Sequence, residues 1–390
     1  MKYDFDEIID RRGTNSLKWD VGENELPMWV ADMDLRTAPE ITDAVKRRAE
    51  HGIFGYSVVP DEWYDAYINW WKTRHNVVYK KDELIFSAGV IPTISSCVRK
   101  LTTAGENVLV MPPVYNIFYN SIKNNGRNVQ ECPLIYADGK YSIDWALLEK
   151  CAADPQTTLM LLCNPHNPIG KIWDRETLAY IGELAHDNGV IVISDEIHCD
   201  ITDPGCEYVP FMSVSEKCAE NSVICVSPTK TFNIAGLQTS AVVVRNAKLR
   251  HKVWRALNTD EVAEPNAFAV QAAVAAFEQG GDWLDELRSY LYENKRTVAE
   301  FLQTELPQIK LIPSQATYLL WLDCSELGMP ARQLQKYLRG STGLYLSGGH
   351  IYGCGDSFMR MNIACPRSVV RDGLERLRRS ADMMKDCSKA

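Results

Sequence analysis

The sequence lacks a Cys-x-x-Cys pair, a run of basic residues and an apolar segment long enough to span a membrane. Its seven histidines show no metal-binding spacing, so we expect no metal site. A net charge of −9 without a basic run argues against nucleic acid as a partner. The 12 cysteines have no paired spacing, and the chain opens with the polar stretch Met1–Asp6 instead of a signal sequence. We therefore expect reduced thiols, a cytoplasmic location and no membrane partner.

What the sequence does contain is material for a large core. Its 390 residues, 46% of them hydrophobic, are too many for one simple core and suit two domains. Apolar runs typical of buried parallel strands alternate with helical stretches over residues 44–277, which we expect to form a large doubly wound α/β domain. Residues 1–43 and 278–390 are expected to form a smaller domain with an amino-terminal arm. Without an internal repeat or a low-complexity linker, the two parts should pack as one unit.

The most informative stretch surrounds Lys230. It follows the continuous apolar run Ser222–Val226, which is typical of a strand buried on both faces. The lysine would therefore lie at the carboxyl end of a parallel sheet, the edge where ligands bind in open α/β sheets. Ser227 and Thr229 supply hydroxyl groups beside it, as a phosphate group requires. This pattern suits a lysine that forms a Schiff base, although a lysine after a strand is more often a solvated surface residue.

Two more apolar runs end in polar residues. Thr157–Cys163 is followed by Asn167, whose proline neighbour favours an extended or turn conformation that would direct its amide into a pocket. Gly189–Ser194 is followed by Asp195, which is either a helix N-cap or the partner of a buried cation. The spacing leaves both interpretations open, and an Asn-Pro pair can also be a simple turn.

In the order Asn167, Asp195 and Lys230, these segments resemble the fold type I enzymes that use pyridoxal 5′-phosphate (PLP). Further stretches resemble the cystathionine β-lyase, or C–S lyase, branch of the class I/II aminotransferase family. They are Pro27–Asp34, Gly55–Tyr56, Pro60–Glu62, Pro112–Tyr115, Ser194–His198 and Arg360–Ala364. The resemblance extends over nearly the whole chain, from about Tyr3 to Arg378. It implies an α/β fold with a mostly parallel seven-stranded sheet between helices, a smaller α+β domain, and a homodimer with shared active sites.

The resemblance also implies a role for each residue around the cofactor ring. Lys230 holds PLP covalently and, once the substrate has displaced it, moves the Cα proton as general base. Asp195 pairs with the ring nitrogen and keeps it protonated, which makes the ring an electron sink. Asn167 binds the ring oxygen, and Tyr115 stacks on the ring face. His198 either reaches the cofactor edge or belongs to the core around it.

The phosphate group of the cofactor is expected beside a fourth segment, Leu84–Ile91, which is first apolar and then rich in small residues. The residues that follow, as far as Lys100, have a helical pattern, so the amides of Gly89 and Val90 would meet the phosphate at a helix N-terminus.

One position departs from the aminotransferase pattern. Those enzymes commonly place an arginine beside the phosphate where this chain has Gln238. The resemblance implies that backbone amides, the hydroxyls of Ser227 and Thr229, and Tyr56 from the neighbouring subunit hold the phosphate instead.

On the substrate side, Arg360 is expected to bind the α-carboxylate, because its guanidinium offers a planar fork of two donors. Its flanks, Phe358 and Ile363, are typical of a buried segment, where an unpaired charge is costly. The resemblance adds three further substrate-binding residues, Asn167, Tyr56 and Ala31. The preceding loop, Gly348–Gly355, is shorter than is usual in the family, which leaves the preferred leaving group open.

The expected reaction is α,β-elimination on an amino acid that carries sulfur at Cβ, with L-cystathionine giving homocysteine, pyruvate and ammonia. Transamination uses the same lysine, aspartate and arginine, and only the resemblance favours elimination over it. A hypothesis from another class is a protein that represses a transcription activator by surface contact, as one member of this branch does.

Overall fold

The computed structural model describes residues 2–387. Its largest sheet has seven strands in the order β2-β10-β9-β8-β7-β3-β4. They are β2 (Leu84–Ser87), β10 (Ser240–Val243), β9 (Ser222–Val226), β8 (Ile191–Asp195), β7 (Thr157–Cys163), β3 (Asn107–Val110) and β4 (Asn128–Glu131). Strand β10 is antiparallel to both of its neighbours, and all the other pairs are parallel. The mostly parallel seven-stranded sheet is thus confirmed.

Both faces of this sheet are covered by helices, as the continuous apolar runs predicted. In β9, the side chains of Val223 and Cys225 belong to one hydrophobic core, and those of Ile224 and Val226 belong to the other. The first core includes helices α3 (Val90–Leu101), α4 (Ile117–Lys123) and α9 (Ala247–Thr259). The second includes α1 (Pro39–Glu50), α2 (Asp61–Arg74), α5 (Trp145–Ala152), α6 (Arg175–Asp187), α7 (Glu216–Glu220) and α10 (Ala269–Gln279).

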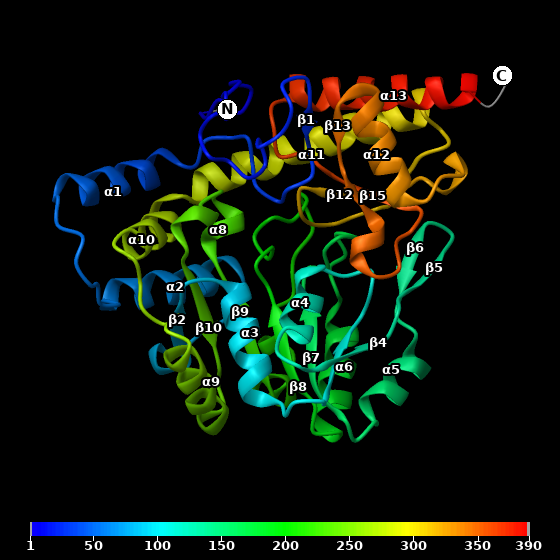
Figure 1. Cartoon of the computed structure of the whole chain (residues 1–390). Coiled ribbons are helices and arrows are strands. Elements are labelled where there is room, and N and C mark those ends of the chain that lie inside the picture. Colours follow the sequence, from blue (N-terminus) through cyan, green and yellow to red (C-terminus); the bar gives the residue numbers. More distant parts are fainter. Residues whose placement is uncertain (1, 388–390) are drawn as a thin grey trace.

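A second, antiparallel sheet has the strand order β11-β12-β15-β14. Its strands are β11 (Lys310–Leu311), β12 (Leu319–Asp323), β15 (Phe358–Asn362) and β14 (Ser347–Gly348). Helices α11 (Gly281–Glu305), α12 (Ala331–Thr342) and α13 (Arg367–Cys387) lie around it, at the top of the view in Figure 1. The amino-terminal arm joins this part, because β1 (Leu26–Pro27) pairs in parallel with β13 (Leu344–Tyr345).

Short elements complete the chain. Strands β5 (Ile135–Ala137) and β6 (Lys140–Ser142) form a hairpin, and α8 (Pro228–Thr231) is a single turn directly after β9. The 3₁₀ turns of the described residues are η1 (Lys81–Glu83), η2 (Phe211–Ser213), η3 (Ala235–Leu237), η4 (Ser325–Leu327) and η5 (Gly349–Tyr352). Within residues 2–387, every helix is too short or too polar to cross a membrane.

The sequence located several of these elements closely. The runs Thr157–Cys163 and Ser222–Val226 are strands β7 and β9 with the predicted bounds. The segment Leu84–Ile91 contains strand β2, which ends at Ser87, and the first residues of α3, which begins at Val90. The predicted run Gly189–Ser194 is displaced, because β8 begins at Ile191. The domain limits at residues 44 and 277 stay a prediction, and both positions lie inside helices, α1 and α10.

Candidate active site

A cavity of about 230 Å³ lies at the carboxyl ends of the central strands of the large sheet. Nine residues of the predicted site line it: Ala31, Gly89, Val90, Tyr115, Asn167, Asp195, His198, Thr229 and Lys230. Parallel pairing brings three of them together, because Asp195 ends β8, Asn167 follows β7 and Lys230 follows β9. The cavity therefore forms at the sheet edge where the sequence placed it.

Lys230 projects from the one-turn helix α8, and its Nζ donates a hydrogen bond to the backbone oxygen of Ala31. Burial lowers the pKa of this amine to about 8. The nearby charges act in both directions, since Asp32 raises the pKa and Arg360 lowers it. Near neutral pH, part of the lysine population therefore carries a neutral amine, the form that acts as nucleophile or base.

The Asp195 carboxylate is buried and accepts one recorded hydrogen bond, from the backbone N–H of Ile197 at 3.2 Å. Burial raises its pKa to about 7, against the opposing effects of the Ile197 N–H and the Lys230 charge. No helix begins between β8 and η2, so the helix N-cap alternative is wrong. The carboxylate instead faces a cavity in which a cationic ligand group would relieve the cost of its burial.

Arg360 reaches the site from β15 of the second sheet. Its Nη1 donates to the Asn167 side-chain oxygen at 3.2 Å, and its Nη2 donates to the backbone oxygen of Trp29 at 2.8 Å. The guanidinium lies 5.1 Å from the Tyr352 ring centroid, and its buried Nε has no hydrogen-bond partner. Arg360 lies next to the cavity through its contact with Asn167 and keeps a free donor for an anion.

Another part of the cavity lining, around Gly89 and Thr229, suits an anion. Gly89 precedes α3 and caps it without a side-chain hydrogen bond, so the first amides of the helix stay open. Gly89, Val90, Thr229 and Gln238 all line the cavity. A helix N-terminus with uncapped amides beside a hydroxyl is a favourable place for a phosphate group.

Ser227 lies next to Thr229, outside the cavity lining. Its hydroxyl donates to the Thr239 backbone oxygen at 2.7 Å and lies 2.7 Å from the Thr229 hydroxyl. It also caps α8 by accepting the Thr229 backbone N–H at 3.1 Å. In this arrangement Ser227 orients Thr229 and is not among the residues that line the cavity.

His198 lines the cavity with a buried side chain whose Nδ1 has no hydrogen-bond partner. Burial, together with the charges of Lys230 and Arg360, lowers the pKa of this imidazole to about 3. The ring is therefore neutral at physiological pH. The ring of Tyr318 lies edge-on to it, with the centroids 6.0 Å apart.

Sequence reasoning missed several residues of this cavity. Most are small or apolar neighbours of predicted positions: Ala88, Ile91, Pro92, Cys163, Ile197 and Ala235. Their proximity in sequence to Gly89, Asn167 and Lys230 was the available signal. Tyr318 does not line the cavity but contacts two residues that do, Ala31 and His198. It precedes β12, and no local pattern connects it to the large sheet.

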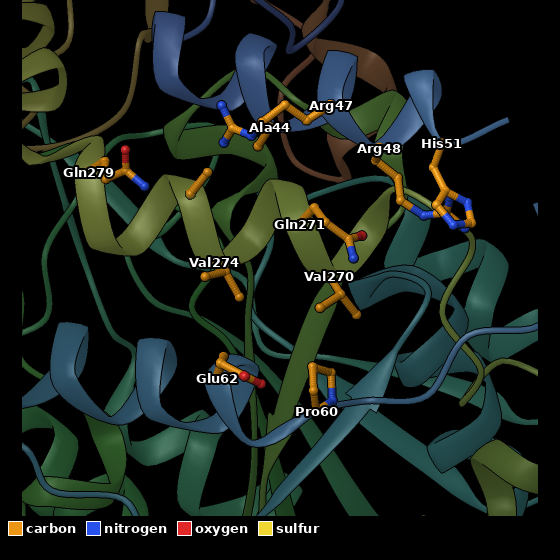
Figure 2. Close-up of a pocket in the computed structure, with 11 residues that line it drawn as sticks. Ala44, Arg47, Arg48, His51, Pro60, Glu62, Val270, Gln271, Val274 and Gln279 are labelled. Carbon is orange, nitrogen blue, oxygen red and sulfur yellow. The ribbon is translucent and has the colours of Figure 1, made fainter. Parts of the chain in front are cut away.

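Tyr56 does not reach the cavity of its own chain. Its side chain is fully exposed, on the extended segment between α1 and α2. Beside this segment, a hollow of about 680 Å³ lies between α1, α2 and α10. Figure 2 shows Arg47 and Arg48 of α1, and His51 just after it, opposite Gln271 of α10 across this hollow.

One group in the described residues places potential metal ligands within 4.8 Å of one another: His75, Cys199 and Asp200. The Asp200 carboxylate already has three hydrogen-bond partners, Trp70 Nε1, His75 Nε2 and Thr231 Oγ1, at 2.8–2.9 Å. A satisfied carboxylate is typical of a buried polar network. The expectation of no metal site stays a prediction.

The fold and the lysine-centred cavity define an α/β enzyme site built around a buried amine and carboxylate. The family model for aminotransferase class I and II matches residues 18–377, and the chain belongs to this family.

Relatives resemble the chain over almost its whole length. It is 43% identical over 381 residues to cystathionine beta-lyase PatB of Bacillus subtilis (strain 168). This alignment covers 96% of the chain and 98% of PatB. It is 34% identical to protein MalY of Escherichia coli (strain K12), over 95% of this chain and 97% of MalY.

Solved structures agree with the sequence relatives. Cystalysin from Treponema denticola, whose crystal structure contains a PLP cofactor, has a TM-score of 0.95 at 32% identity and covers 98% of this chain and 99% of its own. The PLP-bound C–S lyase from Staphylococcus hominis has a TM-score of 0.90 at 32% identity, over 97% of this chain and 98% of its own. The expected fold type I architecture is confirmed.

Proposed function

We propose that the chain is a PLP-dependent C–S lyase. It eliminates the sulfur substituent of L-cystathionine or related S-substituted cysteines and forms a thiol, pyruvate and ammonia. The observation that carries the proposal is the meeting of Lys230, Asp195 and Asn167 in one cavity of a chain 43% identical to a cystathionine β-lyase.

The residues present fit PLP. Asp195 is a buried carboxylate without a cation in contact with it. A protonated ring nitrogen requires such a carboxylate as its partner. Lys230 is an amine whose pKa is lowered to about 8, which favours reaction with an aldehyde. At the other end of the cavity, Gly89 and Val90 present the open N-terminus of α3 to a phosphate group.

Each residue then has a defined task. Lys230 holds the cofactor covalently, and Asp195 pairs with the ring nitrogen. Asn167 and His198 contact the polar edge of the ring. Tyr115 supplies an aromatic face. Gly89, Val90 and Thr229 bind the phosphate, with Ser227 fixing Thr229. When bound, PLP withdraws electrons from the substrate Cα and makes its proton acidic.

The protein performs the remaining steps. Arg360, with its unpaired Nε, binds the substrate α-carboxylate together with Asn167 and the backbone of Ala31. Lys230, released by the substrate amine, takes the Cα proton as general base. The electron pair left at Cα forms a Cα=Cβ double bond as the Cβ–S bond breaks and the thiolate leaves. The released aminoacrylate is then hydrolysed by water to pyruvate and ammonia. The Asp195 carboxylate stabilises positive charge at the ring nitrogen throughout.

The chain is further proposed to act as a homodimer with shared sites. Ile53, Phe54, Tyr56 and Val58 are all more than half exposed on one short segment. Arg48 orders this segment, because its Nη2 donates to the Ile53 backbone oxygen at 2.9 Å and its guanidinium lies 5.5 Å from the Phe54 ring. A second copy covering this apolar segment would bring Tyr56 to the phosphate end of its partner's cavity.

A cytoplasmic location is also proposed. The described cysteines, from Cys97 to Cys365, are all free thiols, which suits a reducing compartment.

The deciding experiment measures pyruvate from L-cystathionine with purified, PLP-loaded protein and no added keto acid. Pyruvate release that is lost in Lys230→Ala supports the lyase. Turnover only after a keto acid is added would replace it with transamination. Lys230→Ala also tests action by surface contact, because a transcription activator retained equally by this variant and the wild type in a pull-down would support that hypothesis.

A further inference from the structure

Thr317 has an unusual backbone conformation directly before strand β12. Its φ is +68°, a left-handed value that β-branched residues rarely adopt. The residue is buried, and its N–H donates to the Ile201 backbone oxygen at 2.7 Å. Its hydroxyl accepts the Leu319 N–H at 3.1 Å. Such conformations persist where surrounding contacts enforce them, and they concentrate at functional sites.

This conformation directs Tyr318 toward the large sheet. The tyrosine is fully buried, and its hydroxyl donates to the Ala31 backbone oxygen at 3.1 Å. Its main-chain oxygen accepts the Ile363 N–H at 3.0 Å, which fixes the residue against β15. The Ala31 oxygen that accepts the tyrosine hydroxyl also accepts Lys230 Nζ. One carbonyl therefore connects Tyr318 to the lysine.

The segment around this carbonyl is held from the same side. Arg360 Nη2 donates to the Trp29 oxygen at 2.8 Å, and Asn362 Nδ2 donates to the Val30 and Asp32 oxygens at 2.6 Å each. Residues 29–32, which we name the arm segment, thus offer successive carbonyls to donors of the second sheet. Tyr318, directly before β12, donates to the carbonyl shared with Lys230.

We propose that Tyr318 is a positioning residue for Lys230, acting through the Ala31 carbonyl. An amine that donates one N–H to a fixed oxygen has its lone pair directed away from that oxygen. When the released Lys230 takes the Cα proton, the new ammonium keeps the same bond, which becomes charge-assisted and stronger. Thr317 acts indirectly, because its backbone conformation orients the Tyr318 hydroxyl. This inference rests on the proposed function and assigns the residue that orients its base.

The first test is Tyr318→Phe, with Tyr79→Phe as the matched control, since Tyr79 is a buried tyrosine whose hydroxyl has no hydrogen-bond partner. In Tyr318→Phe, kcat for pyruvate release should fall about tenfold or more while KM stays within about twofold. The isotope effect with α-deuterated substrate should rise, because proton transfer becomes slower relative to the other steps. Tyr79→Phe should leave kcat, KM and the isotope effect unchanged.

A readout independent of turnover is hydrogen exchange in the cofactor-free protein. Loss of the Tyr318 hydroxyl should speed amide exchange in the peptide covering residues 28–35, including the Asp34 N–H that donates to the Ala364 oxygen at 2.8 Å. Unchanged exchange there in Tyr318→Phe overturns the proposal. A wild-type protein that forms no pyruvate refutes the lyase function instead, so the two failures are distinguishable.

The role of Thr317 is tested by a double-mutant cycle. Thr317→Val keeps the branched shape but removes the hydroxyl that accepts the Leu319 N–H. Alone it should lower kcat, and in the Tyr318→Phe background it should cost nothing more, because both changes act through one hydroxyl. Fully additive effects would overturn this part of the proposal. So would a Tyr318→Phe enzyme with a raised KM and the kcat of the wild type.

Discussion

The Lys230 amine and the Asp195 carboxylate line one cavity without pairing with each other. Lys230 donates to the Ala31 oxygen, and Asp195 accepts the Ile197 N–H. Burial moves both pKa values toward neutrality, to about 8 for the lysine and about 7 for the aspartate. A ligand with an aldehyde at one position and a basic ring nitrogen at another satisfies both groups, and PLP has this combination.

Removing the Asp195 charge should damage catalysis more than binding. Asp195→Asn keeps the shape but cannot stabilise a protonated ring nitrogen, so kcat should fall on the order of a hundredfold or more. Pyruvate release and cofactor content, measured on the same preparation, separate loss of rate from loss of PLP. Asp138→Asn, at an exposed turn position with φ +50°, is the control and should behave as wild type. An Asp195→Asn enzyme with wild-type kcat would contradict this assignment.

Cofactor uptake by the cofactor-free protein should depend on pH through Lys230. The amine reacts only when neutral, and with a pKa lowered to about 8 roughly one tenth of it is neutral at pH 7. The rate of PLP uptake, followed by absorbance after rapid mixing, should therefore rise with pH and level off above about 8. A rate that continues to rise to pH 10, as for an exposed lysine, would refute the lowered pKa.

Stability of the cofactor-free protein should fall as the pH rises through the titration of Asp195. Its folded pKa of about 7 exceeds the ordinary 3.8, so between these values the folded state holds a proton that the unfolded chain has lost. Asp195→Asn lacks this titration. Its free energy of unfolding, relative to that of the wild type, should increase by up to about 4 kcal/mol from pH 4 to pH 8. Urea unfolding at fixed pH measures the difference, and a pH-independent difference contradicts the prediction.

Shared sites can be tested by mixing two inactive variants. Tyr56→Ala should lose phosphate binding in the partner's site, and Lys230→Ala should lose the base in its own. Unfolding and refolding the two together should yield mixed dimers with one intact site, and the mixture should recover about one quarter of wild-type activity. Each variant refolded alone is the control. No recovery, with dimers present by analytical ultracentrifugation, would show that Tyr56 does not complete the partner's site.

The sequence predicted the central part of the fold because both faces of the large sheet are buried. Continuous apolar runs such as Ser222–Val226 mark such strands directly, and parallel strands end at one edge. The meeting of Asn167, Asp195 and Lys230 therefore followed from three local patterns. The antiparallel direction of β10 did not, because a buried apolar run has the same composition in either direction.

Contacts between residues far apart in the sequence could not be predicted from local patterns. Tyr318 joins the site only because Thr317 adopts a left-handed conformation that its side chain disfavours, and no sequence pattern predicts this. Ser227 was placed at the phosphate from its position beside Lys230, whereas its hydroxyl is engaged by Thr239 and Thr229. Helix capping and the rotamers of neighbouring hydroxyls are decided by tertiary packing.

The bonds to the arm segment also constrain how the protein is made. Its carbonyls emerge early from the ribosome, whereas Arg360 and Asn362, which hold three of them, are translated close to the end of the chain. The strands of the large sheet all lie before residue 244, but the carbonyls on either side of the oxygen that receives the lysine amine are not held until β15 has been synthesised and packed. A nascent chain released before residue 360 would therefore contain the lysine, the aspartate and the sheet edge, and still lack a working site.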